Sequence, residues 1–122
     1  MSTIQESGQN YLETIFVLSK NGNKVRSVDI ASALDYSKPS VSVAMKKLRQ
    51  EGLIETDQEG FIVLTKNGKE IAESVYERHM LLSNWLISLG VDKQIAIEDA
   101  CKMEHILSSQ SFEAIRASMN KL

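Results

Sequence analysis

Two short helical patterns with a three-residue break between them restrict the fold of this sequence more than any other feature. The first pattern starts at Ser27, a residue type that caps helices, and Asp35-Tyr36-Ser37 interrupts it. Ser37 then caps the second pattern, whose first turn holds Pro39, the only proline, where a missing N–H costs no hydrogen bond. The apolar residues of the second pattern share one helix face, and they are Val41, Ala44, Met45 and Leu48. The pair therefore predicts a helix-turn-helix.

The flanking segments predict a β-hairpin and further helices. A helix is expected over residues 4–20, and two β-prone runs at residues 53–56 and 61–64 enclose a turn. Three helical patterns follow, and they run from Thr65 to Leu89, from Asp92 to about Ser108, and from Ser111 onward. This order predicts a mainly α fold, in which a winged helix-turn-helix over residues 1–70 precedes a helical part over residues 71–122.

The composition is that of a soluble globular protein. Of the 122 residues, 43% are hydrophobic and 25% are charged, and no apolar run approaches the roughly 18 residues that span a bilayer. The N-terminal segment MSTIQESGQN has neither the basic start nor the apolar core of a secretory signal. A single cysteine cannot form an intramolecular disulfide, which fits a reducing compartment. We expect a cytoplasmic protein without a membrane partner.

The formal net charge of −2 hides an uneven distribution of charge along the chain. Residues 24–50 contain six cations and two acidic residues, an excess of four positive charges over the helix-turn-helix. Such a segment can meet the phosphate backbone of a nucleic acid. A solvated basic helix face without a nucleic-acid partner is the alternative that charge alone leaves open.

Side chains of the helix-turn-helix have the chemistry of DNA recognition. A recognition helix directs its N-terminal residues at base edges in the major groove, while basic residues and helix starts contact phosphates. The candidates for contact with base edges are Pro39, Ser40, Ser42 and Val43, and those for contact with phosphates are Lys46, Lys47 and Arg49. Near the helix starts, the candidates that can donate to the DNA backbone are Ser27, Ser37 and Lys38. Double-stranded DNA is therefore the predicted partner.

The only cysteine of the chain, Cys101, precedes Glu104 by three residues and His105 by four. On a helix these side chains share one face, and thiolate, carboxylate and imidazole all bind first-row metal ions. A lone cysteine is also commonly a small buried hydrophobic residue, so this spacing alone leaves packing and metal binding both open.

The order Cys-x-x-Glu-His superficially resembles inverted zinc-protease motifs. That function requires a third ligand, an open coordination position and a substrate cleft, and it leaves the basic helix-turn-helix unexplained. The sequence contains no nucleophile triad and no glycine-rich phosphate loop. We therefore do not expect an enzyme.

Six segments spread over nearly the whole chain carry a family resemblance. They are NYLETI (10–15), VDIA (28–31), SKPSVS (37–42), LTKNGK (64–69), RHMLL (78–82) and CKMEH (101–105). They resemble segments of the diphtheria toxin repressor family of metal-dependent transcriptional regulators. The first resembles the opening helix of that family, the second and third its helix-turn-helix, and the fourth the end of its wing. The fifth resembles its dimer-domain helix, and the sixth its ligand signature.

This resemblance implies a set of metal ligands, carried over position by position. The set is Asn10 and Glu13 from the first helix, His79 from the fourth, and Cys101, Glu104 and His105 from the fifth. Family members have Met or Asp at the position of Asn10. Glu13 resembles the manganese-sensing branch, whereas Cys101 resembles the iron-sensing branch. Ser83 and Ile97 stand where an iron-type ancillary site has acid and imidazole partners. The implied ion is Fe(II) or Mn(II), with Zn(II), Co(II) and Ni(II) as further candidates.

The function that the resemblance implies is metal-dependent repression. The resemblance assigns residues 1–70 to a winged helix-turn-helix DNA-binding domain and residues 71–122 to a helical metal-binding and dimerisation domain. A homodimer would bind a pseudo-palindromic operator, and an ion would bridge the two domains. The chain ends at Leu122 and so resembles the compact two-domain branch without an SH3-like domain. The alternative is a winged-helix regulator without metal control that responds to a small ligand.

Overall fold

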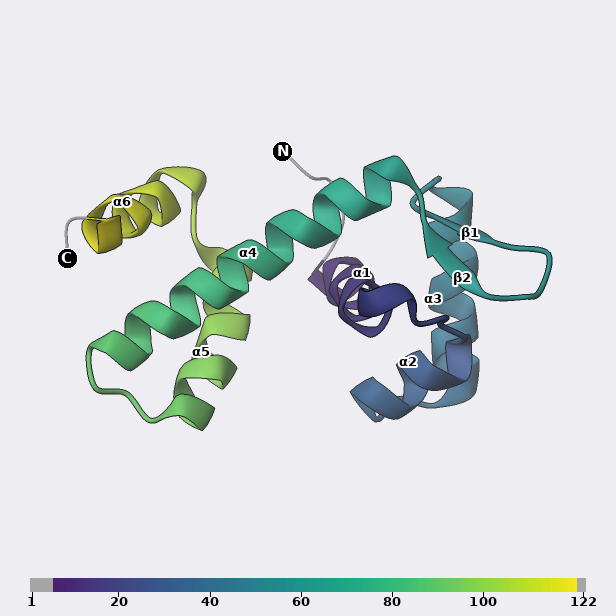
Figure 1. Cartoon of the computed structure of the whole chain (residues 1–122), viewed down its shortest axis with the longest axis horizontal. Coiled ribbons are helices and arrows are strands. Elements are labelled where there is room, and N and C mark those ends of the chain that lie inside the picture. The colour runs from purple at the N-terminus through teal and green to yellow at the C-terminus, as the bar shows by residue number, and fades with distance from the viewer. Residues whose placement is uncertain (1–5, 121–122) are drawn as a thin grey trace. The chain divides into compact units, whose positions relative to one another are not determined.

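The computed structural model describes residues 6–120, which form six α-helices, one 3₁₀ helix and two β-strands (Figure 1). In chain order these are α1 (Glu6–Leu18), η1 (Lys20–Gly22), α2 (Ser27–Leu34), α3 (Lys38–Gln50), β1 (Ile54–Thr56), β2 (Ile62–Leu64), α4 (Lys66–Ser88), α5 (Lys93–Ile106) and α6 (Ser109–Asn120). The chain divides into two compact units, and the division falls inside α4, between Glu73 and Ser74. The predicted mainly α fold, a winged helix-turn-helix followed by a helical part, is confirmed. Within residues 6–120, none of the helices combines the length and the hydrophobicity needed to cross a membrane.

The helices α2 and α3 form the predicted helix-turn-helix. Asp35 ends α2 in the left-handed backbone region, with φ of 57°, and this reverses the chain. The Ser37 hydroxyl oxygen accepts a hydrogen bond from the Ser40 N–H at 3.3 Å, which confirms Ser37 as the cap of α3. Pro39 lies in the first turn of α3, as its missing N–H predicts.

Two predicted helix starts are wrong by one or two residues. Ser27 is the first residue of α2 and does not cap it; instead the Arg26 N–H donates to Asp29 Oδ2 at 2.9 Å. The helix α6 begins before Ser111, because the Ser108 hydroxyl oxygen accepts a hydrogen bond from the Ser111 N–H at 3.1 Å. In both cases a polar side chain other than the expected serine accepts a backbone N–H at the helix start.

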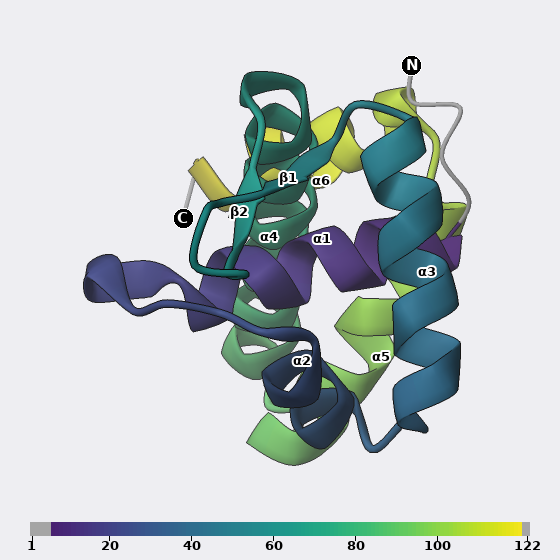
Figure 2. The same ribbon diagram turned by 90° about the vertical axis from the view of Figure 1, so that its right-hand side faces the viewer.

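The core of the first unit is formed by α1, α2, α3 and the hairpin, and α1 lies between α2 and the strands (Figure 2). Its most deeply buried large side chains are Leu12, Ile15, Val25, Ile30, Val41, Met45 and Ile54. At one edge of this core, Tyr11 of α1 meets Tyr36 edge to face, with ring centroids 6.0 Å apart. Loss of hydration raises the pKa of the Tyr11 phenol, with the neighbouring Tyr36 as a smaller cause.

The strands β1 and β2 form the predicted wing as an antiparallel hairpin, in which Ile54 pairs with Leu64. The Ile62 N–H also donates to the Val25 carbonyl oxygen at 2.7 Å. This extra bridge attaches the segment ahead of α2 to the wing.

The junction between the wing and α4 is tightly packed. Thr65 caps α4 as predicted, because its hydroxyl oxygen accepts a hydrogen bond from the Gly68 N–H at 3.1 Å. The Thr65 N–H donates to the Leu53 carbonyl oxygen, also at 3.1 Å. A side-chain carbon at Gly68 would overlap that Leu53 oxygen and would lie 2.9 Å from the Leu53 carbonyl carbon. The first turn of α4 therefore requires a residue without a side chain at position 68.

The helices α4, α5 and α6 build the second unit around a small core. Its buried apolar members are Leu82 of α4, Ala100 of α5 and Phe112 of α6. The guanidinium groups of Arg78 and Arg116 lie 4.8 and 5.0 Å from the centre of the Phe112 ring. Arg78 Nη2 also donates to the Leu107 carbonyl oxygen at 3.0 Å, which ties the connection between α5 and α6 to α4.

Candidate metal centre and nucleic-acid interface

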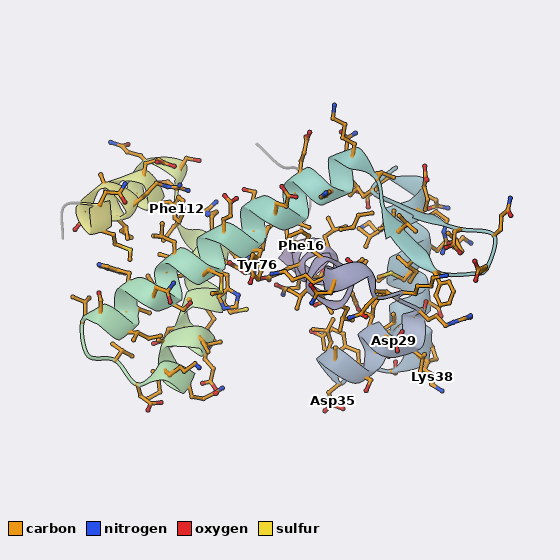
Figure 3. All side chains as sticks on the ribbon, in the orientation of Figure 1. Phe16, Asp29, Asp35, Lys38, Tyr76 and Phe112 are labelled. Atoms are coloured by element: carbon orange, nitrogen blue, oxygen red, sulfur yellow. The ribbon has the colours of Figure 1, made fainter. Side chains whose placement is uncertain are left out.

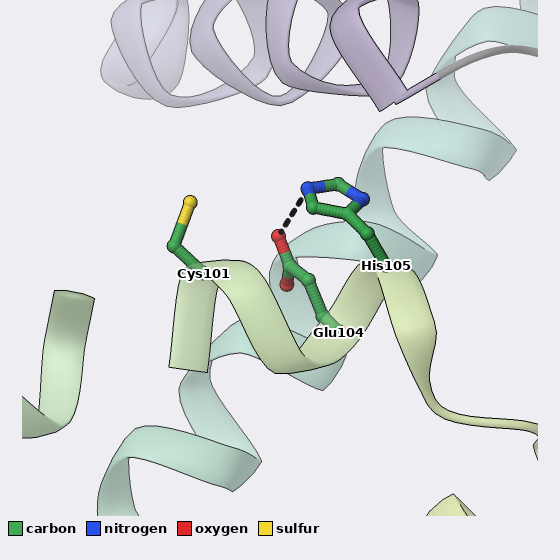
Figure 4. A group of neighbouring side chains, drawn as sticks. All are labelled: Cys101, Glu104 and His105. Atoms are coloured by element: carbon green, nitrogen blue, oxygen red, sulfur yellow. Dashed lines mark ion pairs between the residues drawn. The ribbon is translucent and has the colours of Figure 1, made fainter. Parts of the chain in front are cut away.

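Three potential metal ligands lie together on α5. Figure 4 shows Cys101 and His105 projecting on the same side of the helix, with Glu104 between them. One ligand atom from each residue lies within 4.8 Å of the other two. Glu104 is 4% exposed, and its Oε1 is 3.5 Å from His105 Nε2. The helical spacing of these residues predicted this convergence, which follows from residues at i, i+3 and i+4 sharing one face.

The donor chemistry of this group fits a divalent transition metal. Bonds from such ions to nitrogen, oxygen and sulfur are about 2.0 to 2.3 Å long, so two ligands of one ion lie at most about 4.5 Å apart. The ligand atoms of the three residues lie within 4.8 Å of one another, so their separations are of the size that one ion can bridge. Cys101 forms no disulfide and is half-buried, and a cysteine sulfur binds metal ions as the thiolate.

His79 comes from α4 in the same unit. One of its ring nitrogens lies within 4.8 Å of a Glu104 carboxylate oxygen. One turn later, the buried Ser83 hydroxyl donates to the His79 backbone carbonyl at 2.9 Å, inside the helix. The histidine expected from the resemblance is therefore next to the α5 group, whereas the Ser83 hydroxyl is occupied by the helix backbone.

Asn10 and Glu13, the remaining expected ligands, lie one turn apart on α1 in the first unit. Both are half-buried, and the Asn10 backbone carbonyl accepts a hydrogen bond from the Thr14 hydroxyl at 2.8 Å. Their spacing places them on one face of α1. The expected ligand set thus has two members in the first unit and four in the second.

The candidate DNA-binding residues cover the outer face of the helix-turn-helix. Ser27 is half-buried, and the other candidates are exposed; these are Ser37, Lys38, Pro39, Ser40, Ser42, Val43, Lys46, Lys47 and Arg49. Figure 3 shows Lys38 at the outer edge of the first unit, where α3 begins. This face is accessible and basic, as contact with phosphates requires.

Two basic residues ahead of α2 contact the wing and were not predicted as site residues. The Arg26 guanidinium lies 4.3 Å from the centre of the Phe61 ring, and Lys24 Nζ lies 5.0 Å from it. Lys24 also pairs with Glu59 at 3.5 Å, near the hairpin turn. These contacts join residues more than thirty positions apart in the chain, so no local spacing could have predicted them.

Both parts of the chain match known protein families. Residues 3–60 match the family described as iron dependent repressor, N-terminal DNA binding domain, and residues 65–122 match the iron dependent repressor, metal binding and dimerisation domain. The chain is 37% identical to the transcriptional regulator MntR of Escherichia coli O6:H1 over 112 residues, which cover 92% of this chain and 72% of that protein.

Two further relatives differ in the share of their length that matches. An uncharacterised HTH-type transcriptional regulator of Methanocaldococcus jannaschii is 31% identical, over 97% of this chain and 96% of its own length. The solved structure of the manganese regulator SloR superimposes with a TM-score of 0.83 at 32% identity, over 93% of this chain. Our chain spans about half of that structure, 53% of its length.

Proposed function

Because this chain belongs to the iron-dependent repressor family, we propose that it is a transcriptional repressor whose DNA binding depends on a divalent metal ion. The observation that carries this proposal is the convergence of Cys101, Glu104 and His105 on α5, with ligand atoms within 4.8 Å of one another. The exposed basic surface of α3 supports the DNA-binding half of the proposal.

The proposed ligand set joins side chains from both units. Cys101, Glu104 and His105 would hold the ion from α5, with His79 from α4 and with Asn10 and Glu13 from α1. A bound divalent ion supplies positive charge and coordination bonds among these side chains. Because α1 packs on the helix-turn-helix, ligands on α1 would orient the DNA-binding unit when they bind.

The donor types bear on which ion is bound. A cysteine thiolate and a histidine favour Fe(II), Co(II), Ni(II) and Zn(II), whereas the carboxylates of Glu13 and Glu104 also suit Mn(II). The relatives named above include a manganese regulator, and the family description names iron. We propose Fe(II) or Mn(II) as the cellular ion.

The proposed mode of DNA binding is a homodimer on a pseudo-palindromic operator in the cytoplasm. Two recognition helices that read successive major-groove segments must lie about 34–36 Å apart, or a multiple of that distance. A metal that favours this separation raises operator affinity, typically by about 1–3 kcal/mol, and DNA must strengthen metal binding equally. The proposal includes no enzymatic activity.

Fluorescence anisotropy with duplex DNA tests the proposal. We expect Mn(II) or Fe(II) to raise affinity by about 5- to 150-fold over chelator-treated protein. Glu104→Gln should remove this increase, whereas Glu98→Gln, at an exposed position of the same helix, should retain it. Equal affinity with and without chelator would refute metal control and favour a winged-helix regulator that responds to a small ligand.

A further inference from the structure

Val43 is the most exposed large hydrophobic residue in the described part of the first unit. Its exposed fraction is 71%, and the next highest value there is 49%, for Tyr36. The other apolar residues of α3 behave differently, since Val41 and Met45 are almost fully buried. Val43 therefore contributes little to the core on which α3 packs.

Helix propensity does not explain why a valine occupies position 43 either. A β-branched side chain loses rotamer freedom in a helix, and a polar or longer residue would be more favourable at an exposed position. On the helix surface its neighbours at spacings of three and four are Ser40, Pro39, Lys46 and Lys47, all of them exposed. Val43 is thus an apolar group next to two exposed lysines that can contact phosphates.

The major groove offers a specific apolar partner for such a side chain. Each base pair presents hydrogen-bond donors and acceptors there, and thymine alone adds a C5-methyl group. Valine has no hydrogen-bonding group and cannot read the polar pattern. The valine side chain can exclude water from the thymine methyl group, and lysines that bind the flanking phosphates would hold it in the groove.

We propose that Val43 determines sequence specificity by packing against the C5-methyl group of a thymine in the operator. This inference rests on the proposed DNA-binding function and adds the base that the recognition helix selects. Removal of one methyl group from such a contact weakens binding about fourfold.

The test compares thymine with uracil, which lacks only that methyl group. The Mn(II)-loaded protein first selects a duplex from a random pool, and each thymine of the selected duplex is then replaced singly by deoxyuridine. We expect one position in each half-site at which the wild-type protein loses affinity about three- to tenfold. Val43→Ala should lose a similar factor on the thymine duplex and less than twofold further on the uracil duplex.

Val17→Ala provides the matched control, because Val17 is an exposed valine of α1 in the same unit, with 43% exposure. It should retain the wild-type response to uracil. If no thymine position responds to the substitution, or if Val43→Ala responds as strongly as the wild type, the inference is wrong while DNA binding stands. If the protein enriches no duplex from the pool, with Mn(II) or with chelator, the proposed function itself fails and the inference fails with it.

Discussion

Replacement of Gly68 by alanine should destabilise the first unit, although alanine is the better helix former. The added carbon would overlap the Leu53 carbonyl oxygen and would lie 2.9 and 3.3 Å from the Leu53 carbonyl carbon and Cα. All three are backbone atoms, and the oxygen also accepts the Thr65 N–H at 3.1 Å. No flexible side chain can move aside, so either α4 or the backbone at Leu53 must shift.

The size of the effect follows from opposing contributions. In a helix interior alanine is more favourable than glycine by about 1 kcal/mol, and this is the most that alanine can gain at the buried position 68 in the first turn of α4. Overpacking against a fixed backbone costs about 1–3 kcal/mol, and loss of the hydrogen bond between Thr65 and Leu53 costs about 1 kcal/mol more. The free energy of unfolding should therefore decrease by about 1–3 kcal/mol, since the steric cost exceeds the gain in helix propensity.

Urea denaturation followed by circular dichroism measures this change. Asn67→Ala is the control, because Asn67 is the exposed neighbour in the same helix turn, and this variant should be as stable as the wild type or slightly more stable. A Gly68→Ala protein with wild-type or greater stability would show that the packing against Leu53 does not constrain position 68.

Three other predictions address the metal site, the DNA face and the core of the second unit. His105→Ala should abolish metal-stimulated operator binding but leave the far-ultraviolet circular dichroism spectrum unchanged; stimulation that persists in an anisotropy titration removes His105 from the ligand set. Lys46→Ala and Lys47→Ala should weaken binding to all duplex sequences similarly and reduce the salt slope by about 1 each; a loss confined to the selected duplex contradicts phosphate contact. Leu82→Ala should lower the free energy of unfolding by about 2–5 kcal/mol in urea titrations, because Leu82 is fully buried; a loss below 1 kcal/mol would mean that the surrounding helices close the cavity.

Local patterns predicted the parts of the fold that depend on near neighbours in the chain. Caps at Ser37 and Thr65 were predictable, because a hydroxyl at a helix start reaches an N–H three residues later. The same reasoning failed at Ser27, where Asp29 satisfies the backbone instead. Polar residues close together in the sequence offer alternative helix starts, and sequence alone does not decide between them.

Features that depend on contacts between distant parts of the chain could not be predicted from sequence patterns. The fit of Gly68 against Leu53 depends on how the wing meets α4, and the position of Arg26 over Phe61 depends on how the hairpin folds back. The expected metal ligands also fall into those set by local spacing and those set by distant contacts. The convergence on α5 follows from helix geometry, whereas the participation of Asn10 and Glu13 stays a prediction.

The attachment of the wing to the segment ahead of α2 has a consequence for the energetics of operator recognition. A hairpin of two three-residue strands is too small to hold its own shape in water. The Ile62 bridge to Val25 and the cations against Phe61 hold it in place before any duplex arrives. Any contact that the wing makes with DNA should therefore cost little conformational entropy, so that more of the contact energy is retained as affinity.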